Sequence, residues 1–325
     1  MPSSRGVVVC ACSNRLASNW FRRACFSRAR RQKCRSGSKG APGQRKTDLP
    51  AKRRDLPIGV FDSGIGGLTV LKALRERLPG ESLIYLGDTA RLPYGTKSAA
   101  AISHYAVQAA HALVSTGIKA LVVADNTSSA LALETLRTEF PGLPVIGVVE
   151  PGATAAGHAS ANGRIVVIAT ESTVQAGSYP RAVLNSRPGA QVRSLACPLF
   201  VSMTEEGMVD GPIAEQIARH YLAPLFLDPE PALRGDCLLL GCTHFPALAP
   251  LLHDLLGPEV AIVDSATTTA SAVEDVLTHR RLAATHGTPH IRYMSTDAPD
   301  RFARIAAIFV PWPLTAEQVE LVDIG

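Results

Sequence analysis

Two short segments of the chain place a reactive side chain directly after an apolar run. One segment begins Asp125-Asn-Thr, and the other begins Cys242-Thr-His. Asp and Cys side chains are candidate general acids or bases, and the residues that follow them can form hydrogen bonds. Two acid/base groups that face each other across a cleft would suit the transfer of a proton from one face of a carbon atom to the other.

Each of these segments also has a simpler structural explanation. Cys242 precedes His244 by two residues, which suggests a thiol tuned by an imidazole, and the alternative is a buried, inert cysteine. Asp125 follows a predicted strand, where an acid/base could act, but Asp is also a preferred N-cap of a helix. Asn126 and Thr127 offer neutral hydrogen-bonding groups that suit a zwitterion.

A glycine-rich segment, Asp62-Ser-Gly-Ile-Gly-Gly, follows the first apolar run and opens an amphipathic helix. Glycines let the backbone approach a ligand closely, and a helix N-terminus favours an anion. The spacing matches neither a dinucleotide-binding motif nor a P-loop, so the segment favours a small carboxylate over a nucleotide. A helix cap at Ser63 with glycines for packing would give the same pattern.

A further strand end carries Gly87-Asp-Thr, and Pro93-Tyr94-Gly95 follows shortly after it. Ligands of open α/β sheets bind at the carboxyl ends of strands, so this stretch can contribute to a site. Pro-Tyr-Gly is also ordinary turn chemistry.

The elements that must position these residues alternate along the chain. Continuous Val/Ile/Leu-rich runs are typical of strands in a parallel sheet buried on both faces, and amphipathic stretches lie between them. This alternation predicts an α/β fold with helices covering largely parallel sheets, divided into two similar halves near Glu150-Pro-Gly. The predicted strands are Ile58–Phe61, Leu83–Leu86, Ala120–Ala124, Val145–Val149, Ile165–Ala169, Cys237–Leu240 and Val260–Val263.

The charge of the 325-residue chain is unevenly spread. Residues 1–55 carry 15 Lys/Arg and two acids, a net of +13, whereas the remainder carries 18 Lys/Arg and 26 Asp/Glu, a net of −8. The body is therefore acidic, so the basic pI of the chain comes from residues 1–55 and is no evidence for nucleic-acid binding, which we do not expect. No apolar run is long enough for a membrane helix. The cysteine spacings suit neither a disulfide framework nor a zinc site, which favours a reduced, cytoplasmic setting.

Residues 1–56 form a separate compositional segment. It is rich in Arg and Ser, and we expect it to be disordered. Three interpretations remain open: an organellar transit-like segment, a nucleic-acid-binding arm, or residues that precede the true translation start.

Four motifs in this order resemble those of the glutamate racemases, in the cofactor-independent aspartate/glutamate racemase superfamily. The resemblance covers roughly residues 57–325. The motifs are IGVFDSGIGGLTV from Ile58, GDTARLPYG from Gly87, ACPLFV from Ala196 and GCTHFP from Gly241.

The resemblance implies two α/β domains with the active site in the cleft between them. Residues 57–149 and 259–325 would form the first domain, and residues 150–258 the second. Such enzymes move the α-proton of glutamate with two facing acid/base residues, without cofactor or metal, and supply D-glutamate for peptidoglycan. Homodimers are common in the family.

The resemblance also implies residue roles. Asp125 and Cys242 would be the catalytic pair, with His244 beside the thiol and Glu205 supporting the site. The substrate-binding residues would be Asp62, Ser63, Tyr94, Gly95, Asn126, Thr127, Thr173 and Thr243.

Asp125 departs from the family pattern, which has a cysteine at this position. A carboxyl group has a reference pKa of about 3.9 against about 8.5 for a thiol. A buried aspartate can be a competent base, so we expect slow or direction-biased racemisation. Two alternatives stay open: a one-cysteine decarboxylase of the arylmalonate type, and an inactive homologue that binds an amino acid.

Overall fold

Two parallel sheets form the frame of the protein. The computed structural model describes residues 53–227, 230 and 234–325. The larger sheet has the strand order β10-β9-β2-β1-β3-β4 and the smaller has β6-β5-β7-β8, with parallel pairing throughout. The predicted α/β fold is therefore confirmed. The strands are β1 Ile58–Asp62, β2 Leu83–Gly87, β3 Ala120–Val123, β4 Val145–Gly147, β5 Arg164–Ala169, β6 Gln191–Ala196, β7 Cys237–Gly241, β8 Ala261–Asp264, β9 Ile291–Ser295 and β10 Val319–Leu321.

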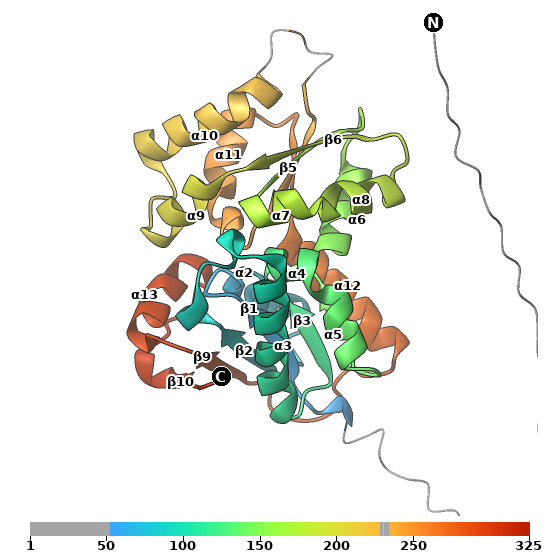
Figure 1. Cartoon of the computed structure of the whole chain (residues 1–325), viewed down its shortest axis with the longest axis vertical. Helices are drawn as coiled ribbons and strands as arrows, with labels where there is room; N and C mark the ends of the chain where they lie inside the picture. The colour runs from blue at the N-terminus through green and yellow to red at the C-terminus, as the bar shows by residue number, and fades with distance from the viewer. Residues whose placement is uncertain (1–52, 228–229, 231–233) are drawn as a thin grey trace, which may run out of the picture. The chain divides into compact units, whose positions relative to one another are not determined.

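Helices cover both faces of each sheet. Figure 1 shows β5 and β6 with α8 and α10 in one half, and β1, β2 and β3 with α3 and α12 in the other. None of the helices in the described part of the chain is both long and apolar enough to cross a membrane. The helices are α2 Leu68–Arg77, α3 Ala99–Ser115, α4 Asn126–Leu131, α5 Leu133–Glu139, α6 Val149–Ala159, α7 Glu171–Ala176, α8 Ser178–Ser186, α9 Pro198–Glu205, α10 Gly211–Phe226, α11 Ala249–Leu256, α12 Ser265–His279 and α13 Pro299–Phe309.

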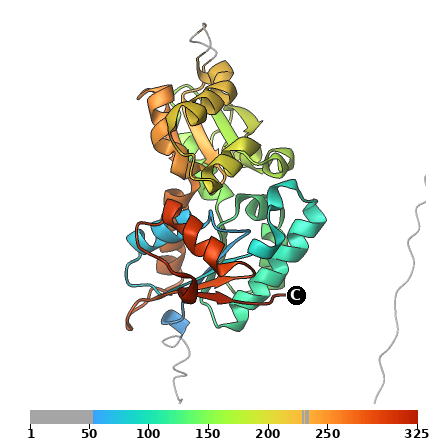
Figure 2. The ribbon, with the colours of Figure 1, turned by 90° about the vertical axis from the view of Figure 1, so that its left-hand side faces the viewer.

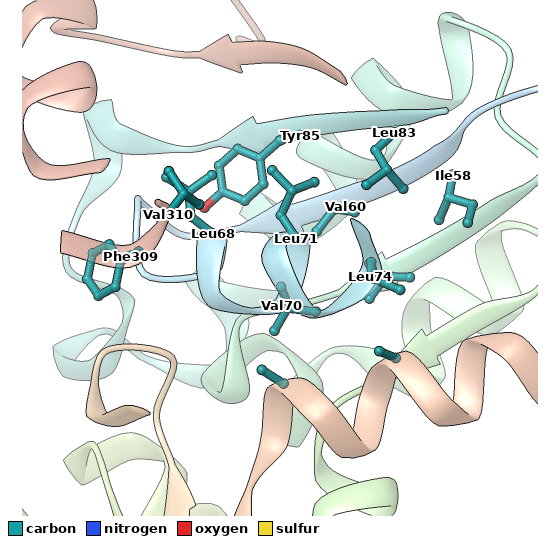
Figure 3. Close-up of a cluster of buried hydrophobic side chains, with 14 of the residues drawn as sticks. Ile58, Val60, Leu68, Val70, Leu71, Leu74, Leu83, Tyr85, Phe309 and Val310 are labelled. Atoms are coloured by element: carbon teal, nitrogen blue, oxygen red, sulfur yellow. The ribbon is translucent and has the colours of Figure 1, made fainter. Parts of the chain in front are cut away.

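The core of the larger sheet is divided between its two faces. Side chains alternate along a strand, so Val60 of β1 points into one hydrophobic cluster and Phe61 into the other. Figure 3 shows the first cluster, in which Leu71 of α2 and Tyr85 of β2 pack with Val60. The second cluster joins the opposite face to α3 and α5. The smaller sheet repeats this plan, with α9, α10 and α11 on one face and α6 and α8 on the other.

The C-terminal part of the chain completes the larger sheet. Strand β9 pairs with β2, and β10 pairs with β9. In the turned view of Figure 2, this red segment lies in the same half as the blue strands that begin the sheet. The search for continuous apolar runs does not predict β6, β9 or β10. These strands mix polar and apolar residues, and β6 and β10 lie at the edges of their sheets.

The predicted domain division remains a prediction, and strand pairing differs from it at one point. The division at 258/259 would assign β8 to the first domain, whereas β8 pairs with β7 in the smaller sheet. Helix α12 then leads back to pack against α2 under the larger sheet. The pairing therefore places the crossover after Asp264.

Most of the segment predicted to be a disordered tail lies outside the described residues. Its last four residues, 53–56, contact the body. Arg53 donates from Nη2 to the carbonyl of Gly142 at 2.8 Å, and Lys119 donates from Nζ to the carbonyl of Arg54 at 2.5 Å. These contacts hold residues 53–56 against the larger sheet.

Lys119 and Glu81 form a buried ion pair next to this segment. Their side chains are 0% and 5% exposed, and burial lowers the pKa of Lys119. Glu81 also accepts a hydrogen bond from the backbone N–H of Ala284 at 2.8 Å. The pair thus joins the starts of β2 and β3 to the loop after α12.

The substitution Lys119→Met should lower the free energy of unfolding by about 3–5 kcal/mol, because it leaves the charge of Glu81 buried without its partner. Chemical denaturation followed by circular dichroism measures this. The control is Lys72→Met, which breaks an exposed pair with Glu76 at 4.0 Å and should change stability by less than about 1 kcal/mol. Equal, small losses in both variants would contradict the role given to the buried pair.

Candidate active site

The site is built at equivalent positions of the two sheets. The chain runs from β1 outward to β2 and then crosses to β3, so strand order reverses between β1 and β3. It reverses in the same way between β5 and β7. Ligands of open α/β sheets bind at the carboxyl ends of strands where the order reverses. Ser63 and Asp125 follow β1 and β3, and Thr170 and Cys242 follow β5 and β7.

Three hydrogen-bond donors hold the carboxylate of Asp125. One oxygen, Oδ2, accepts from the backbone N–H and the hydroxyl of Ser128, both at 2.6 Å, which makes Asp125 the N-cap of α4. The other oxygen, Oδ1, accepts from the Ser63 hydroxyl at 3.1 Å. The predicted alternative for Asp125, a helix cap, is therefore present, and the same carboxylate also lines a cavity.

Burial sets the protonation behaviour of this side of the site. Asp125 is 7% exposed, and desolvation raises its pKa against the opposing effect of its hydrogen bonds from Ser128 and Ser63. Burial and the neighbouring charge of Asp125 raise the pKa of Asp62 to about 6. A raised pKa makes Asp125 a stronger base than an exposed aspartate.

The opposite side carries a chain of charged and polar groups. The Cys242 sulfur lies 3.7 Å from His244 Nδ1, and His244 Nε2 lies 3.2 Å from Glu205 Oε1. Arg301 donates from Nη2 to the other oxygen of Glu205, Oε2, at 2.7 Å. Cys242 is a free thiol. The chain thus runs from the thiol through an imidazole and a carboxylate to a guanidinium group.

Hydrogen bonding keeps the imidazole of His244 charged. Burial alone would lower its pKa, but the hydrogen bonds with Cys242 and Glu205 outweigh burial and raise the pKa to about 10. The hydrogen bond from His244 lowers the pKa of Glu205, against the effect of burial. The charged imidazole therefore lies between the Cys242 sulfur and the Glu205 carboxylate.

Close backbone approach brings the two sides together. A Cβ on Gly66 would lie 2.5 Å from Oγ1 of Thr243 and 2.7 Å from Nδ1 of His244. The hydroxyl of Thr69 donates to the carbonyl of Thr243 at 3.2 Å. Position 66 therefore needs glycine for contact with the Cys242 loop, which is a stronger requirement than the anion site inferred from the glycine pattern.

A cavity of about 410 Å³ lies between these groups. Loops from both sheets line it, so most of the predicted site residues meet at one place. The predicted residues that line it are Ser63, Tyr94, Gly95, Asp125, Thr127, Glu205, Cys242, Thr243 and His244. The hydroxyl of Tyr94 donates to Asp88.

Three predicted substrate-binding residues are not among the lining residues. Asp62 is buried and accepts from the backbone N–H of Gly64 at 2.9 Å. Asn126 donates to the Tyr179 hydroxyl at 2.6 Å. Thr173 lies 3.1 Å from Thr127, hydroxyl to hydroxyl, behind the cavity wall. Thr173 therefore bonds to a residue that lines the cavity, whereas Gly64 and Tyr179 are not lining residues.

Several residues of the site carry no signal in the sequence that singles them out. Ser128 and Thr170 resemble ordinary helix-start residues, and Tyr179 resembles a core residue of α8. Arg301 lies 59 residues after Cys242 on an amphipathic helix, where an exposed Arg is expected. Folding brings Thr170 and Arg301 to the cavity. It also brings Ser128 to the Asp125 carboxylate and Tyr179 to Asn126.

A larger open groove of about 860 Å³ lies elsewhere, along α5, α6 and α12. It contains Arg137, Glu150 and Arg280 but none of the predicted acid/base residues. The smaller cavity is the candidate active site because Asp125 and Cys242, the two predicted acid/base residues, line it.

The chain is similar to known proteins over most of its length. Residues 58–273 match the family model described as Asp/Glu/Hydantoin racemase. The glutamate racemase of Neisseria meningitidis serogroup A is 43% identical over 273 residues, which cover 84% of this chain and 98% of that protein.

Solved structures give the same result. The glutamate racemase of Francisella tularensis, in complex with D-glutamate, has a TM-score of 0.76 and 36% identity, covering 83% of this chain and 98% of that one. The glutamate racemase of Thermus thermophilus, in complex with β-chloro-D-alanine, has a TM-score of 0.73 and 41% identity, covering 83% and 97%.

The substitution Glu205→Gln should lower the pKa of His244, because the imidazolium loses the charge of its carboxylate partner. Titration of the His244 ring signals by NMR measures this. Glu206→Gln is the matched control, since Glu206 is exposed and is the next residue in the chain. An unchanged His244 titration in Glu205→Gln would show that the hydrogen bond does not set the charge of the imidazole.

Proposed function

This chain belongs to the Asp/Glu/hydantoin racemase family, and we propose that it interconverts L- and D-glutamate with Asp125 and Cys242 as the facing acid/base pair. It is an amino-acid racemase, hence an isomerase. The main support for the proposal is that Asp125, which follows a strand of the larger sheet, and Cys242, which follows a strand of the smaller sheet, line the same cavity.

The reaction needs one proton transfer on each face of the α-carbon. In one direction the Asp125 carboxylate takes the α-proton, and the Cys242 thiol gives a proton to the opposite face. This leaves a carboxylic acid and a thiolate, and the imidazolium of His244 stabilises the thiolate. In the other direction the thiolate takes the proton and the Asp125 acid donates one. Proton exchange with water resets the pair.

The hydrogen-bonding groups of the wall would hold the substrate. The hydroxyls of Ser63, Thr127 and Thr243 line the cavity on both sides of the acid/base pair. They can accept from the substrate ammonium group and donate to its carboxylates. Glutamate is therefore held between the two proton-transfer groups by neutral donors and acceptors.

A carboxyl group and a thiol differ in acid strength, and this difference affects kcat and KM in the two directions of the reaction. L- and D-glutamate have equal free energies in solution, so kcat/KM must be equal in the two directions. The reaction of one enantiomer starts with Asp125 as the carboxylate and Cys242 as the thiol. The reaction of the other enantiomer starts with Asp125 as the carboxylic acid and Cys242 as the thiolate. Any bias will therefore appear as unequal kcat values with compensating KM values.

The proposal extends to the cellular role. The D-glutamate formed would supply peptidoglycan synthesis in the cytoplasm. The enzyme would act as a homodimer, as the family resemblance implies, and sedimentation equilibrium of the full chain tests this point.

The variants Asp125→Asn and Cys242→Ser should each lower kcat in both directions by about 100- to 10,000-fold, because each removes one proton-transfer group. Racemisation of each pure enantiomer, followed by polarimetry, measures this. Asp254→Asn is the control, since Asp254 is an exposed residue of α11. Wild-type rates in Asp125→Asn would exclude Asp125 from the reaction. A wild-type protein that binds D-glutamate without turnover would instead be an amino-acid-binding protein.

The variant Ser128→Ala should move the acid limb of the kcat/KM profile to higher pH. The Ser128 hydroxyl stabilises the Asp125 carboxylate, so its removal raises the pKa of Asp125, and the base is lost at a higher pH. The matched control is Ser271→Ala at a half-buried serine of α12 that does not line the cavity, and it should leave the profile unchanged. An acid limb that stays in place or moves down would contradict the hydrogen bond's effect.

A further inference from the structure

One ion pair joins residues of the two halves at the edge of the candidate active site. Arg301 belongs to α13, which packs in the core of the larger sheet through Phe302 and Ile305. Glu205 is the last residue of α9, which packs against the smaller sheet. The distance from Arg301 Nη2 to Glu205 Oε2 is 2.7 Å. The pair therefore crosses between elements of different sheets.

The Glu205 carboxylate is shared between two cations. Its Oε2 accepts from Arg301, and its Oε1 faces His244 Nε2 at 3.2 Å. The Glu205 side chain is 17% exposed and ends a helix of eight residues. Without a partner at Oε2, it could rotate towards solvent. The contact with Arg301 fixes which oxygen faces the imidazole.

We propose that Arg301 is a positioning residue for the reaction, acting on Cys242 through Glu205 and His244. This inference rests on the proposed function. Arg301 holds the carboxylate, the carboxylate holds the imidazolium, and the imidazolium lies beside the sulfur that transfers the proton. Arg301 lies on α13, which packs on the larger sheet, so the contacts behind Cys242 include side chains from both halves.

The competing role for Arg301 is direct contact with the substrate. Among the described residues that line the cavity, Arg301 is the one Arg or Lys, and a substrate carboxylate could reach it. The two roles differ in one respect. A positioning residue needs Glu205 for its effect, whereas a substrate contact does not.

A double-mutant cycle separates the two roles. The variants are Arg301→Ala, Glu205→Gln and both together, each with the full chain and both enantiomers of glutamate. We expect Arg301→Ala to lower kcat roughly 10- to 100-fold, as loss of precise positioning does. In the Glu205→Gln background the same substitution should change kcat little. Arg301→Lys should retain part of the activity, and the exposed Arg304→Ala on the same helix should retain all of it.

Additive losses in the cycle, or a rise in KM alone, would overturn the inference in favour of direct substrate contact. Wild-type kcat in Arg301→Ala would overturn it as well. An inactive wild type would refute the proposed function itself.

A second readout does not depend on turnover. Alkylation of Cys242 by iodoacetamide, followed by peptide mass spectrometry, reports how readily the thiolate forms. It should slow in Arg301→Ala and in Glu205→Gln, with no further slowing in the double variant. Faster alkylation in Arg301→Ala would mean that Arg301 only restricts access, which would contradict the positioning role. Thermal unfolding followed by circular dichroism checks that each variant folds.

Discussion

The burial of the Asp125 carboxylate is the constraint on which the rest of the site depends. A buried charge is costly unless hydrogen-bond donors surround it. Two serines and the start of α4 supply those donors, and burial still raises the pKa of the carboxyl group. A residue that caps a helix thereby also presents a carboxyl group of raised pKa to a cavity. Asp62 is affected as well. Its own burial and the nearby charge of Asp125 raise its pKa to about 6.

Each half presents a reactive side chain to the cavity, and the two side chains differ in their chemistry. Both sheets reverse their strand order between the first and third strands of the half, so each presents a reactive side chain at its reversal. On one side, neutral hydroxyls and a backbone N–H hold a carboxylate. On the other, an imidazolium and a carboxylate stand behind a thiol. A symmetric frame therefore holds two chemically different groups. In the proposed reaction, the equal free energies of the two enantiomers require equal kcat/KM, and the difference between the two groups appears as unequal kcat values.

The sequence predicts the central strands and the local motifs better than the edges and long-range contacts. Continuous apolar runs mark β1, β3 and β7, because both faces of these strands are buried. Edge strand β6 has partly exposed residues and gives no such run. Cys242 and His244 are two residues apart in the sequence, so their contact can be predicted from the sequence. The contact of Arg301 with Glu205 spans 96 residues and depends on how two helices of different sheets meet.

The most direct test of the central claim is exchange of the α-proton of glutamate in heavy water, followed by proton NMR. The purified full chain is incubated separately with L- and with D-glutamate. The account predicts that both enantiomers lose the α-proton signal and that each forms the other. Loss of the signal from one enantiomer alone, without inversion, would contradict Asp125 as a working partner of Cys242. No exchange from either enantiomer would contradict the racemase reaction as a whole.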